Sequence, residues 1–159
     1  MRPGTLAQSA AAVVITATVG GLASRPAESD WYSKLRKPRF QPPRQVFPVV
    51  WPILYADIAA VSASVLDHFE DQHRPDKARA YTAALAINLL LNGSWTWLFF
   101  NRHRLGASAV AAAALTVSSA DLTRRGLEAR STRAAPLTLY PLWCAFATLL
   151  STRIWWLNR

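Results

Sequence analysis

The sequence predicts an all-α membrane protein, in which five transmembrane helices form one bundle and an ordered first loop acts as a lid. Three observations predict this fold class. Hydrophobic residues make up 52% of the 159 residues and charged residues only 17%, against roughly 25% charged residues in a typical soluble domain. The charged residues gather in clusters that separate five long apolar runs. The connection after the first run is long and rich in proline.

The five apolar runs reach or approach the length needed to cross a bilayer as a helix, which is roughly 20 residues. The expected helices cover residues of about 5–23, 46–66, 80–101, 105–122 and 135–157, within a single domain over residues 1–159. The first run could instead be the core of a secretory signal, but it is longer than the roughly 7–15 residues of such a core. We therefore expect a retained helix there. The fourth run is short and relies on Asp121 and Thr123 snorkelling to the interface.

The net charge of +9 comes from 18 Lys and Arg against 9 Asp and Glu. In a soluble domain this excess would raise the question of nucleic acid. Here the bases lie in the connections between apolar runs, which is typical of contacts with lipid headgroups. We therefore expect membrane lipid, and no nucleic acid, as a partner. Slightly more bases lie on the side of the first loop and the C-terminus, which we expect in the cytoplasm, with the N-terminus outside.

The first loop, residues of about 24–45, contains three prolines in its second half. Proline fixes its own backbone and restricts the residue before it, so this loop can hold a defined shape. Trp31, Tyr32 and Phe40 could form an aromatic belt at headgroup depth. The alternative, which we favour, is a lid over the end of the bundle, because long ordered loops in compact domains tend to be functional.

Aromatic residues and prolines recur in a characteristic order from this loop to the last span. They are Trp31-Tyr32, Leu35, Lys37-Pro38, Phe40, Pro42-Pro43, Val46-Phe47-Pro48, Trp51, Leu54-Tyr55, Asn92, Trp95, Phe99-Phe100, Tyr140, Trp143, Ala147 and Leu157-Asn158. In these residues the chain resembles the TspO/MBR family, the tryptophan-rich sensory proteins and translocator proteins. The resemblance covers residues 28–159. It implies a bundle of five helices, usually dimeric, whose first loop folds over a ligand pocket.

Helical periodicity independently groups polar and aromatic side chains on single faces of the spans. These faces are Asn88, Asn92, Trp95 and Phe99 in the third span, Trp51 and Tyr55 in the second, and Tyr140, Trp143, Ala147 and Ser151 in the fifth. The amides could simply be hydrogen-bonding contacts between helices, with the tryptophans filling space. Together with the aromatic loop, however, the three faces favour a pocket for a flat apolar ligand.

The resemblance implies a porphyrin or haem-type tetrapyrrole as the ligand of this pocket. Carried over position by position, the ligand-binding residues are Tyr32, Pro42, Phe47, Trp51, Asn92, Trp95, Trp143, Ala147 and Leu150. The propionates of such a ligand would meet the bases of the loop, which are Arg36, Lys37, Arg39 and Arg44. The chain would then be a sensor, carrier or scavenger of tetrapyrroles. The alternative is an enzyme that degrades protoporphyrin oxidatively in light, with the participation of Trp51.

Conventional catalytic groups are expected to play no part. The three histidines lie outside the predicted spans, and Cys144 has no histidine near it in its own span. We therefore expect no catalytic residue, no metal and no dissociable cofactor. Cholesterol is a weak candidate, because the proposed sterol pattern needs a base close to Tyr140 and the next base is Arg153.

Composition and small residues suggest the location and the assembly of the chain. Fifteen of the 18 bases are Arg and alanine is abundant, which suggests a GC-rich bacterial source and a multi-pass protein of the inner membrane. Alanines four residues apart permit close approach of two helices. They are Ala80 with Ala84, Ala107 with Ala111, and Ala109 with Ala113. We expect a homodimer through one of these faces.

Asp57 departs from the family pattern, which has an apolar residue at this position. A carboxylate within a membrane span is by default a hypothesis for a functional site. The alternative is a structural acid that is protonated, or paired with Arg153 or with a second protomer.

Overall fold

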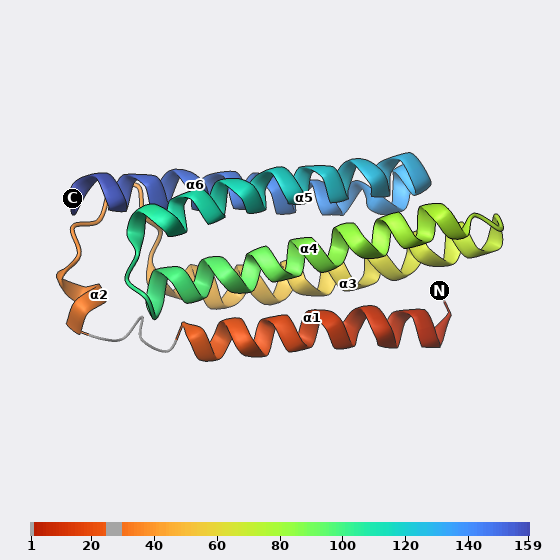
Figure 1. Cartoon of the computed structure of the whole chain (residues 1–159), viewed down its shortest axis with the longest axis horizontal. Coiled ribbons are helices and arrows are strands. Elements are labelled where there is room, and N and C mark those ends of the chain that lie inside the picture. Colours follow the sequence, from red (N-terminus) through yellow and green to blue (C-terminus); the bar gives the residue numbers. More distant parts are fainter. Residues whose placement is uncertain (1, 25–29) are drawn as a thin grey trace.

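The computed structural model describes residues 2–24 and 30–159, which form helices and their connections (Figure 1). The helices are α1 (Pro3–Ala23), α2 (Asp30–Lys34), α3 (Phe47–Asp71), α4 (Pro75–Phe100), α5 (Leu105–Ala134) and α6 (Leu139–Leu157). Short 3-10 turns at Arg44–Val46 and Ala135–Thr138 lead into α3 and α6. Five of the described helices are long and apolar enough to span a membrane, which confirms the predicted fold class.

The outer surface of the bundle is apolar. Leu90 of α4 is 71% exposed, and Val110 and Val117 of α5 are each 72% exposed. An aqueous surface with so many large apolar side chains would be unfavourable, whereas lipid tails solvate them well. The exterior of these helices is therefore a lipid-facing surface.

Three helices are longer than expected at the end of the bundle opposite the first loop, whereas α6 begins at Leu139, after a 3-10 turn, instead of at about residue 135. α3 and α4 run about one turn beyond the predicted 46–66 and 80–101, and α5 ends at Ala134 instead of about residue 122. Charged residues mark where a helix leaves the hydrocarbon, but its backbone hydrogen bonds continue into water. The predicted boundaries of these three helices were therefore too short at this end.

The extension of α5 is held by ion pairs along one helix. Arg124 contacts Asp121 at 2.7 Å and Glu128 at 2.6 Å, three and four residues away. Arg125 contacts the other oxygen of Asp121 at 2.6 Å. Pairs at this spacing stabilise an exposed helix by about 0.2–0.5 kcal/mol each, which supports a helix whose sequence is no longer apolar.

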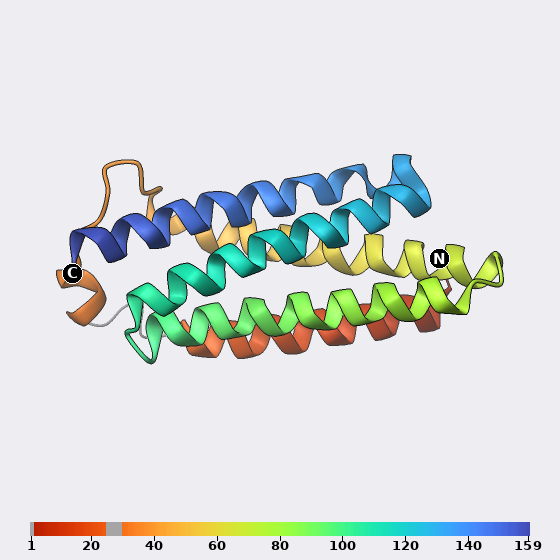
Figure 2. The same ribbon diagram turned by 45° about the horizontal axis from the view of Figure 1, so that its top comes forward.

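α1 lies against α3 and α4, while α5 lies between α4 and α6 (Figures 1 and 2). Polar contacts fix both ends of α1. The backbone N–H of Arg2 donates to Asp67 Oδ2 at 2.6 Å, and its guanidinium contacts Glu70 and Asp71. At the other end, Asn101 Nδ2 donates to the carbonyl oxygen of Ala23 at 2.7 Å. α1 is thereby tied to α3 at its N-terminus and to the end of α4 at its C-terminus.

The described part of the first loop packs on the end of the bundle. The ring of Trp31 stacks on His103, with 3.8 Å between ring centroids, and Tyr32 meets Phe99 edge to face. Further along, Arg36 N–H donates to Asn158 Oδ1, and Asn158 Nδ2 donates to the Arg36 carbonyl, both at 2.9 Å. The loop thus covers this end of the bundle as an ordered segment, except for residues 25–29, which lie outside the described residues.

Two of the three alanine pairs expected at a dimer interface have one member that faces the interior, and Ala111 of the third pair is half-buried. Ala80, Ala107 and Ala113 are exposed, whereas Ala109 is buried and Ala84 packs against the hydrophobic core. A larger residue at Ala84 would therefore strain the packing of this chain itself. The homodimer stays a prediction.

Replacing Asn158 by Leu should release the loop, because Leu keeps the size of the side chain but loses both hydrogen bonds to Arg36. We expect trypsin to cut after Arg36 and Arg39 several-fold faster, with a loss of stability of about 1–2 kcal/mol. Mass spectrometry of timed digests in detergent measures the cuts, and thermal unfolding measures the stability. Asn158→Asp keeps the hydrogen-bond acceptor, so its cutting rate and its stability should lie between those of the unmodified protein and of Asn158→Leu. Equal cutting rates in all three proteins would show that this anchor does not order the loop.

Candidate functional site

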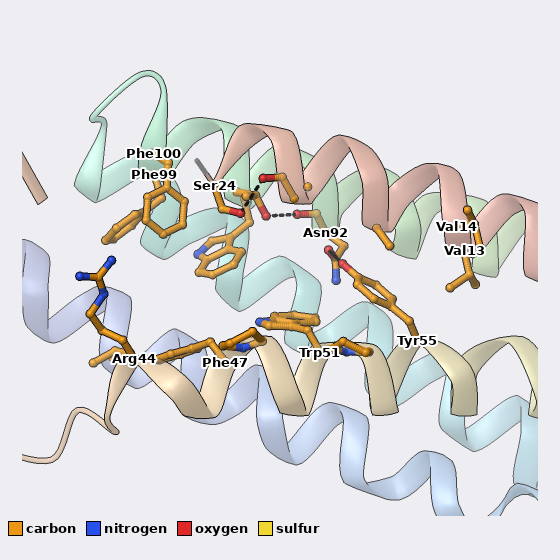
Figure 3. Close-up of a pocket in the computed structure, with 18 of the residues that line it drawn as sticks. Val13, Val14, Ser24, Arg44, Phe47, Trp51, Tyr55, Asn92, Phe99 and Phe100 are labelled. Carbon is orange, nitrogen blue, oxygen red and sulfur yellow. Dashed lines mark hydrogen bonds between the residues drawn. The ribbon is translucent and has the colours of Figure 1, made fainter. Parts of the chain in front are cut away.

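A cavity of about 1380 Å³ opens inside the bundle at the end covered by the loop. Its walls come from α1, α3, α4 and α6, and its mouth from the loop (Figure 3). The volume is larger than the roughly 300–1000 Å³ of common ligand pockets. The cavity can therefore accept a large ligand.

Aromatic rings form one side of this cavity. Phe47, Trp51 and Tyr55 succeed one another along α3 because residues four apart share a helix face, and they follow the cavity in Figure 3. The ring centroids of Trp51 and Tyr55 are 5.5 Å apart, and those of Trp51 and Trp95 are 6.2 Å apart. Trp95 in turn lies 6.2 Å from Phe99. These five residues, the aromatic wall, join α3 to α4 by ring contacts.

Behind the wall, a chain of hydrogen bonds crosses the bundle. Tyr55 O–H donates to Asn92 Oδ1 at 2.8 Å, and Asn92 Nδ2 donates to the Tyr140 hydroxyl at 3.3 Å. Tyr140 O–H donates to Asn88 Oδ1 at 2.8 Å, and Asn88 Nδ2 donates to Ser118 Oγ at 3.3 Å. Asn88 therefore connects helices, which is one of the two roles that the sequence left open for it. Asn92 connects helices and also lines the cavity.

The mouth of the cavity carries polar groups from the loop. Tyr32, Arg44 and Gln45 line it, and Lys37 Nζ lies 4.1 Å from the centre of the Tyr32 ring. Burial raises the pKa of Tyr32, while the hydrogen bond from Gln41 and the charge of Arg44 lower it. Burial also lowers the pKa of Lys37, and the positive charge of Arg44 acts in the same direction. At neutral pH the mouth thus presents a neutral phenol beside cations.

Six of the nine predicted ligand-binding residues line the cavity, and they are Tyr32, Phe47, Trp51, Asn92, Trp95 and Leu150. Pro42, Trp143 and Ala147 do not. Trp143 lies on the predicted face of α6, but its ring contacts Phe47 at 5.9 Å and Phe146 at 5.4 Å between centroids. From α6, the cavity is reached by Leu150, Ser151 and Ile154, closer to the C-terminus.

The sequence interpretation missed the wall formed by α1. Ala10, Val13, Ala17 and Gly20 line the cavity at a spacing of three and four residues. This stripe of small residues was the available signal, since a helix that borders a cavity needs no bulky side chains there. Thr96 of α4 also lines the cavity and was not predicted.

The cavity continues to the outer surface between α1 and α3. Val14 of α1, which lines it, is 60% exposed, and Gly21 of α1 is also exposed. On α3, the lining residues Pro48, Pro52 and Ala56 are exposed. Because this seam lies within two spanning helices, it connects the cavity with the lipid side of the bundle.

Asp57 lies outside this cavity and is not paired with Arg153. Its Oδ2 atom is buried without a hydrogen-bond partner among the described residues, while Arg153 is exposed and makes no ion pair with it. Of the alternatives left open for Asp57, pairing with Arg153 is therefore wrong. α3 places Asp57 on a different side from Trp51 and Tyr55, which face the cavity.

The other titratable candidates do not line the cavity either. His68 belongs to the last turn of α3 instead of a connection, whereas His73 and His103 lie in turns. Cys144 is a buried free thiol. Within residues 2–24 and 30–159, no group of three His, Cys, Asp or Glu residues could hold a metal ion.

Comparison with known proteins gives a consistent family match. Residues 9–157 match the TspO/MBR family. The chain is 32% identical to the translocator protein of Bos taurus, over 81% of this chain and 75% of that protein. It is 32% identical to the tryptophan-rich protein TspO of Chlorobaculum tepidum, over 84% and 83% of the two chains. It is also 30% identical to an uncharacterized membrane protein, YtaB, of Bacillus subtilis, over 81% of each.

Replacing Tyr140 by Phe should destabilise the bundle by about 1–3 kcal/mol, because the change leaves Asn88 Oδ1 and Asn92 Nδ2 unpaired in the interior. Tyr81→Phe is the matched control, since that buried hydroxyl forms one hydrogen bond among the described residues, with Ser62 at 3.2 Å. Thermal unfolding of both variants in the same detergent measures the difference. An equal loss in both would contradict the importance of the chain of hydrogen bonds.

Proposed function

The chain belongs to the TspO/MBR family of membrane proteins, and we propose that its cavity binds a porphyrin or related tetrapyrrole. The aromatic wall carries this proposal. A flat conjugated macrocycle gains both apolar burial and ring stacking against such a wall. The size of the cavity, about 1380 Å³, supports a ligand of this kind.

Arg44 supports a ligand that carries carboxylates. Of the four loop bases predicted to meet propionates, only Arg44 lines the cavity, and Figure 3 shows its guanidinium at the mouth. A guanidinium can bind a carboxylate with two parallel hydrogen bonds. In this arrangement the macrocycle lies along the aromatic wall and its propionates emerge at the loop.

The charge of this end of the bundle favours an acidic ligand as well. Among the described residues it carries nine bases, Lys34, Arg36, Lys37, Arg39, Arg44, Arg102, Arg104, Arg153 and Arg159, against one acid, Asp30. The opposite end balances its bases with carboxylates such as Asp67, Glu70 and Asp121. A uniformly positive mouth attracts anions and orients them before contact.

As a role in the cell, we infer a sensor, carrier or scavenger of such ligands in the inner membrane of a bacterium, with the chain assembled as a homodimer. Two relatives of this chain are named a translocator protein and a tryptophan-rich sensory protein. The seam between α1 and α3 gives a ligand dissolved in the bilayer a route to the cavity, and the ordered loop acts as its lid. Degradation of protoporphyrin in light remains the second candidate, because Trp51 lines the cavity.

Replacing Trp95 by Ala should weaken protoporphyrin binding by about 1–3 kcal/mol, roughly 5- to 150-fold in Kd, through loss of a stacked ring. Trp97→Ala is the matched control on the same helix, because Trp97 is 48% exposed and does not line the cavity. Titration of protein fluorescence with protoporphyrin measures both. Equal affinities in the two variants would place the ligand elsewhere.

Removing the charge of Arg44 with Arg44→Gln should weaken binding of protoporphyrin about 5- to 20-fold at low salt. The dimethyl ester of protoporphyrin should bind the unmodified protein and Arg44→Gln equally, because its esterified propionates carry no charge. The loss should shrink as salt is added, since ions screen a partly exposed pair. Arg39→Gln is the control, as Arg39 is exposed and does not line the cavity. An equal loss of affinity for the ester would show that Arg44 shapes the mouth without binding carboxylate.

A further inference from the structure

Two hydroxyl groups form a polar corner at the deeper part of the cavity, next to Gly20. The corner consists of Gly20 on α1, Tyr55 on α3, and Asn92 and Thr96 on α4, all of which line the cavity. A side chain carbon placed on Gly20 would lie 3.9 Å from both Thr96 Oγ1 and the Tyr55 hydroxyl oxygen. Both oxygens therefore face the space that the missing side chain of Gly20 leaves open.

Both hydroxyl hydrogens are already used. Thr96 Oγ1 donates to the backbone carbonyl of Asn92 at 3.2 Å, and a carbonyl oxygen can only accept. Tyr55 O–H donates to Asn92 Oδ1 at 2.8 Å. A hydroxyl has one hydrogen and two lone pairs, so the two oxygens offer the cavity only acceptors.

The distances along the chain of hydrogen bonds support this direction. The bonds from Tyr55 and Tyr140 to amide oxygens are 2.8 Å, and those from Asn92 and Asn88 to hydroxyl oxygens are 3.3 Å. An O–H donor gives the shorter bonds and an N–H donor the longer ones. The four bonds of this chain thus all run in one direction, from Tyr55 toward Ser118, and the Tyr55 hydroxyl is left with an acceptor.

We propose that the polar corner binds a hydrogen-bond donor of the ligand, and so selects a flat acid that carries a hydroxyl or N–H group at the edge opposite its carboxylates. The inference rests on the proposed function for its use of a tetrapyrrole acid. Arg44 at the mouth can only donate, whereas the hydroxyl oxygens of Tyr55 and Thr96 in the corner are left to accept. Tyr55 lies eleven residues after Arg44, roughly 18 Å along the rise of the 3-10 turn and of α3. A donor at the mouth and acceptors deeper in the cavity therefore fix the direction in which the ligand enters.

Three porphyrin diacids test this selection, because they share the propionate edge and differ in the two groups opposite to it. Mesoporphyrin has ethyl groups there, haematoporphyrin has hydroxyethyl groups that donate, and diformyl-deuteroporphyrin has formyl groups that only accept. Fluorescence titration of the full chain in detergent gives Kd for each. We expect haematoporphyrin to bind at least about threefold more tightly than mesoporphyrin, and the diformyl compound to bind least tightly.

Variants of the polar corner test whether its residues cause the preference for haematoporphyrin over mesoporphyrin. Thr96→Val, which keeps the shape of the side chain, should reduce the ratio of the two Kd values toward one, and Thr96→Ser should keep it. Gly20→Ala fills the space beside both hydroxyls and should also remove the preference without lowering the thermal midpoint, because alanine favours a helix more than glycine. Gly93→Ala is its control, since a side chain there meets nothing within 4 Å and Gly93 does not line the cavity.

The outcomes separate this inference from the proposed function. A preference for the diformyl compound would show that the corner donates, and would overturn the inference. Equal binding of all three porphyrins, or a hydroxyl preference that survives both Thr96→Val and Gly20→Ala, would overturn it as well while leaving porphyrin binding intact. Failure of all three to bind would overturn the proposed function, and the inference with it.

Discussion

The structure depends on the need to pair every polar group that enters the hydrocarbon, because lipid offers no hydrogen bonds in exchange. The chain of bonds from Tyr55 through Asn92, Tyr140 and Asn88 to Ser118 meets this need with neutral groups. It joins α3, α4, α6 and α5 in one network. The network also fixes the rotation of α4, since Asn88 and Asn92 must both point inward. Once they do, Trp95 and Phe99 face the cavity on the same stripe.

The same network explains how one set of residues can hold the bundle together and still offer a binding surface. A linear chain of hydrogen bonds has two ends, and each interior member has a partner on both sides. Asn88 and Tyr140 are interior members and are completely buried. Tyr55 is an end member at the cavity, where its oxygen keeps unused lone pairs. Asn92 is an interior member that also lines the cavity, so the same residues can hold the helices together and still border the ligand.

Much of the fold, and about half of the site, could be predicted from the sequence because both depend on local patterns. Gaps between charges located five spans, and periodicity located the face that carries Asn92 and Trp95. Periodicity gives the face of a helix but not the depth at which neighbouring helices diverge, and so Trp143 was placed in a cavity that it does not line. Tyr55 was part of the predicted face. Its place at the end of a chain of hydrogen bonds, however, depends on the rotamers of side chains from four helices. Whether Asp57 lines the cavity likewise depends on which side of α3 faces the cavity, and the sequence does not specify that side.

The contribution of α1 shows why a cavity is harder to predict than a core. A core is specified by the large side chains that fill it, whereas a cavity is specified by side chains that are small. Ala10, Ala17 and Gly20 leave space beside the aromatic wall, yet in sequence they resemble any apolar span. The space does not collapse because α1 is held at both ends, by Arg2 on the carboxylates of α3 and by Asn101 at Ala23. The cavity is therefore a product of contacts made at the two ends of α1, far from the residues that line its middle.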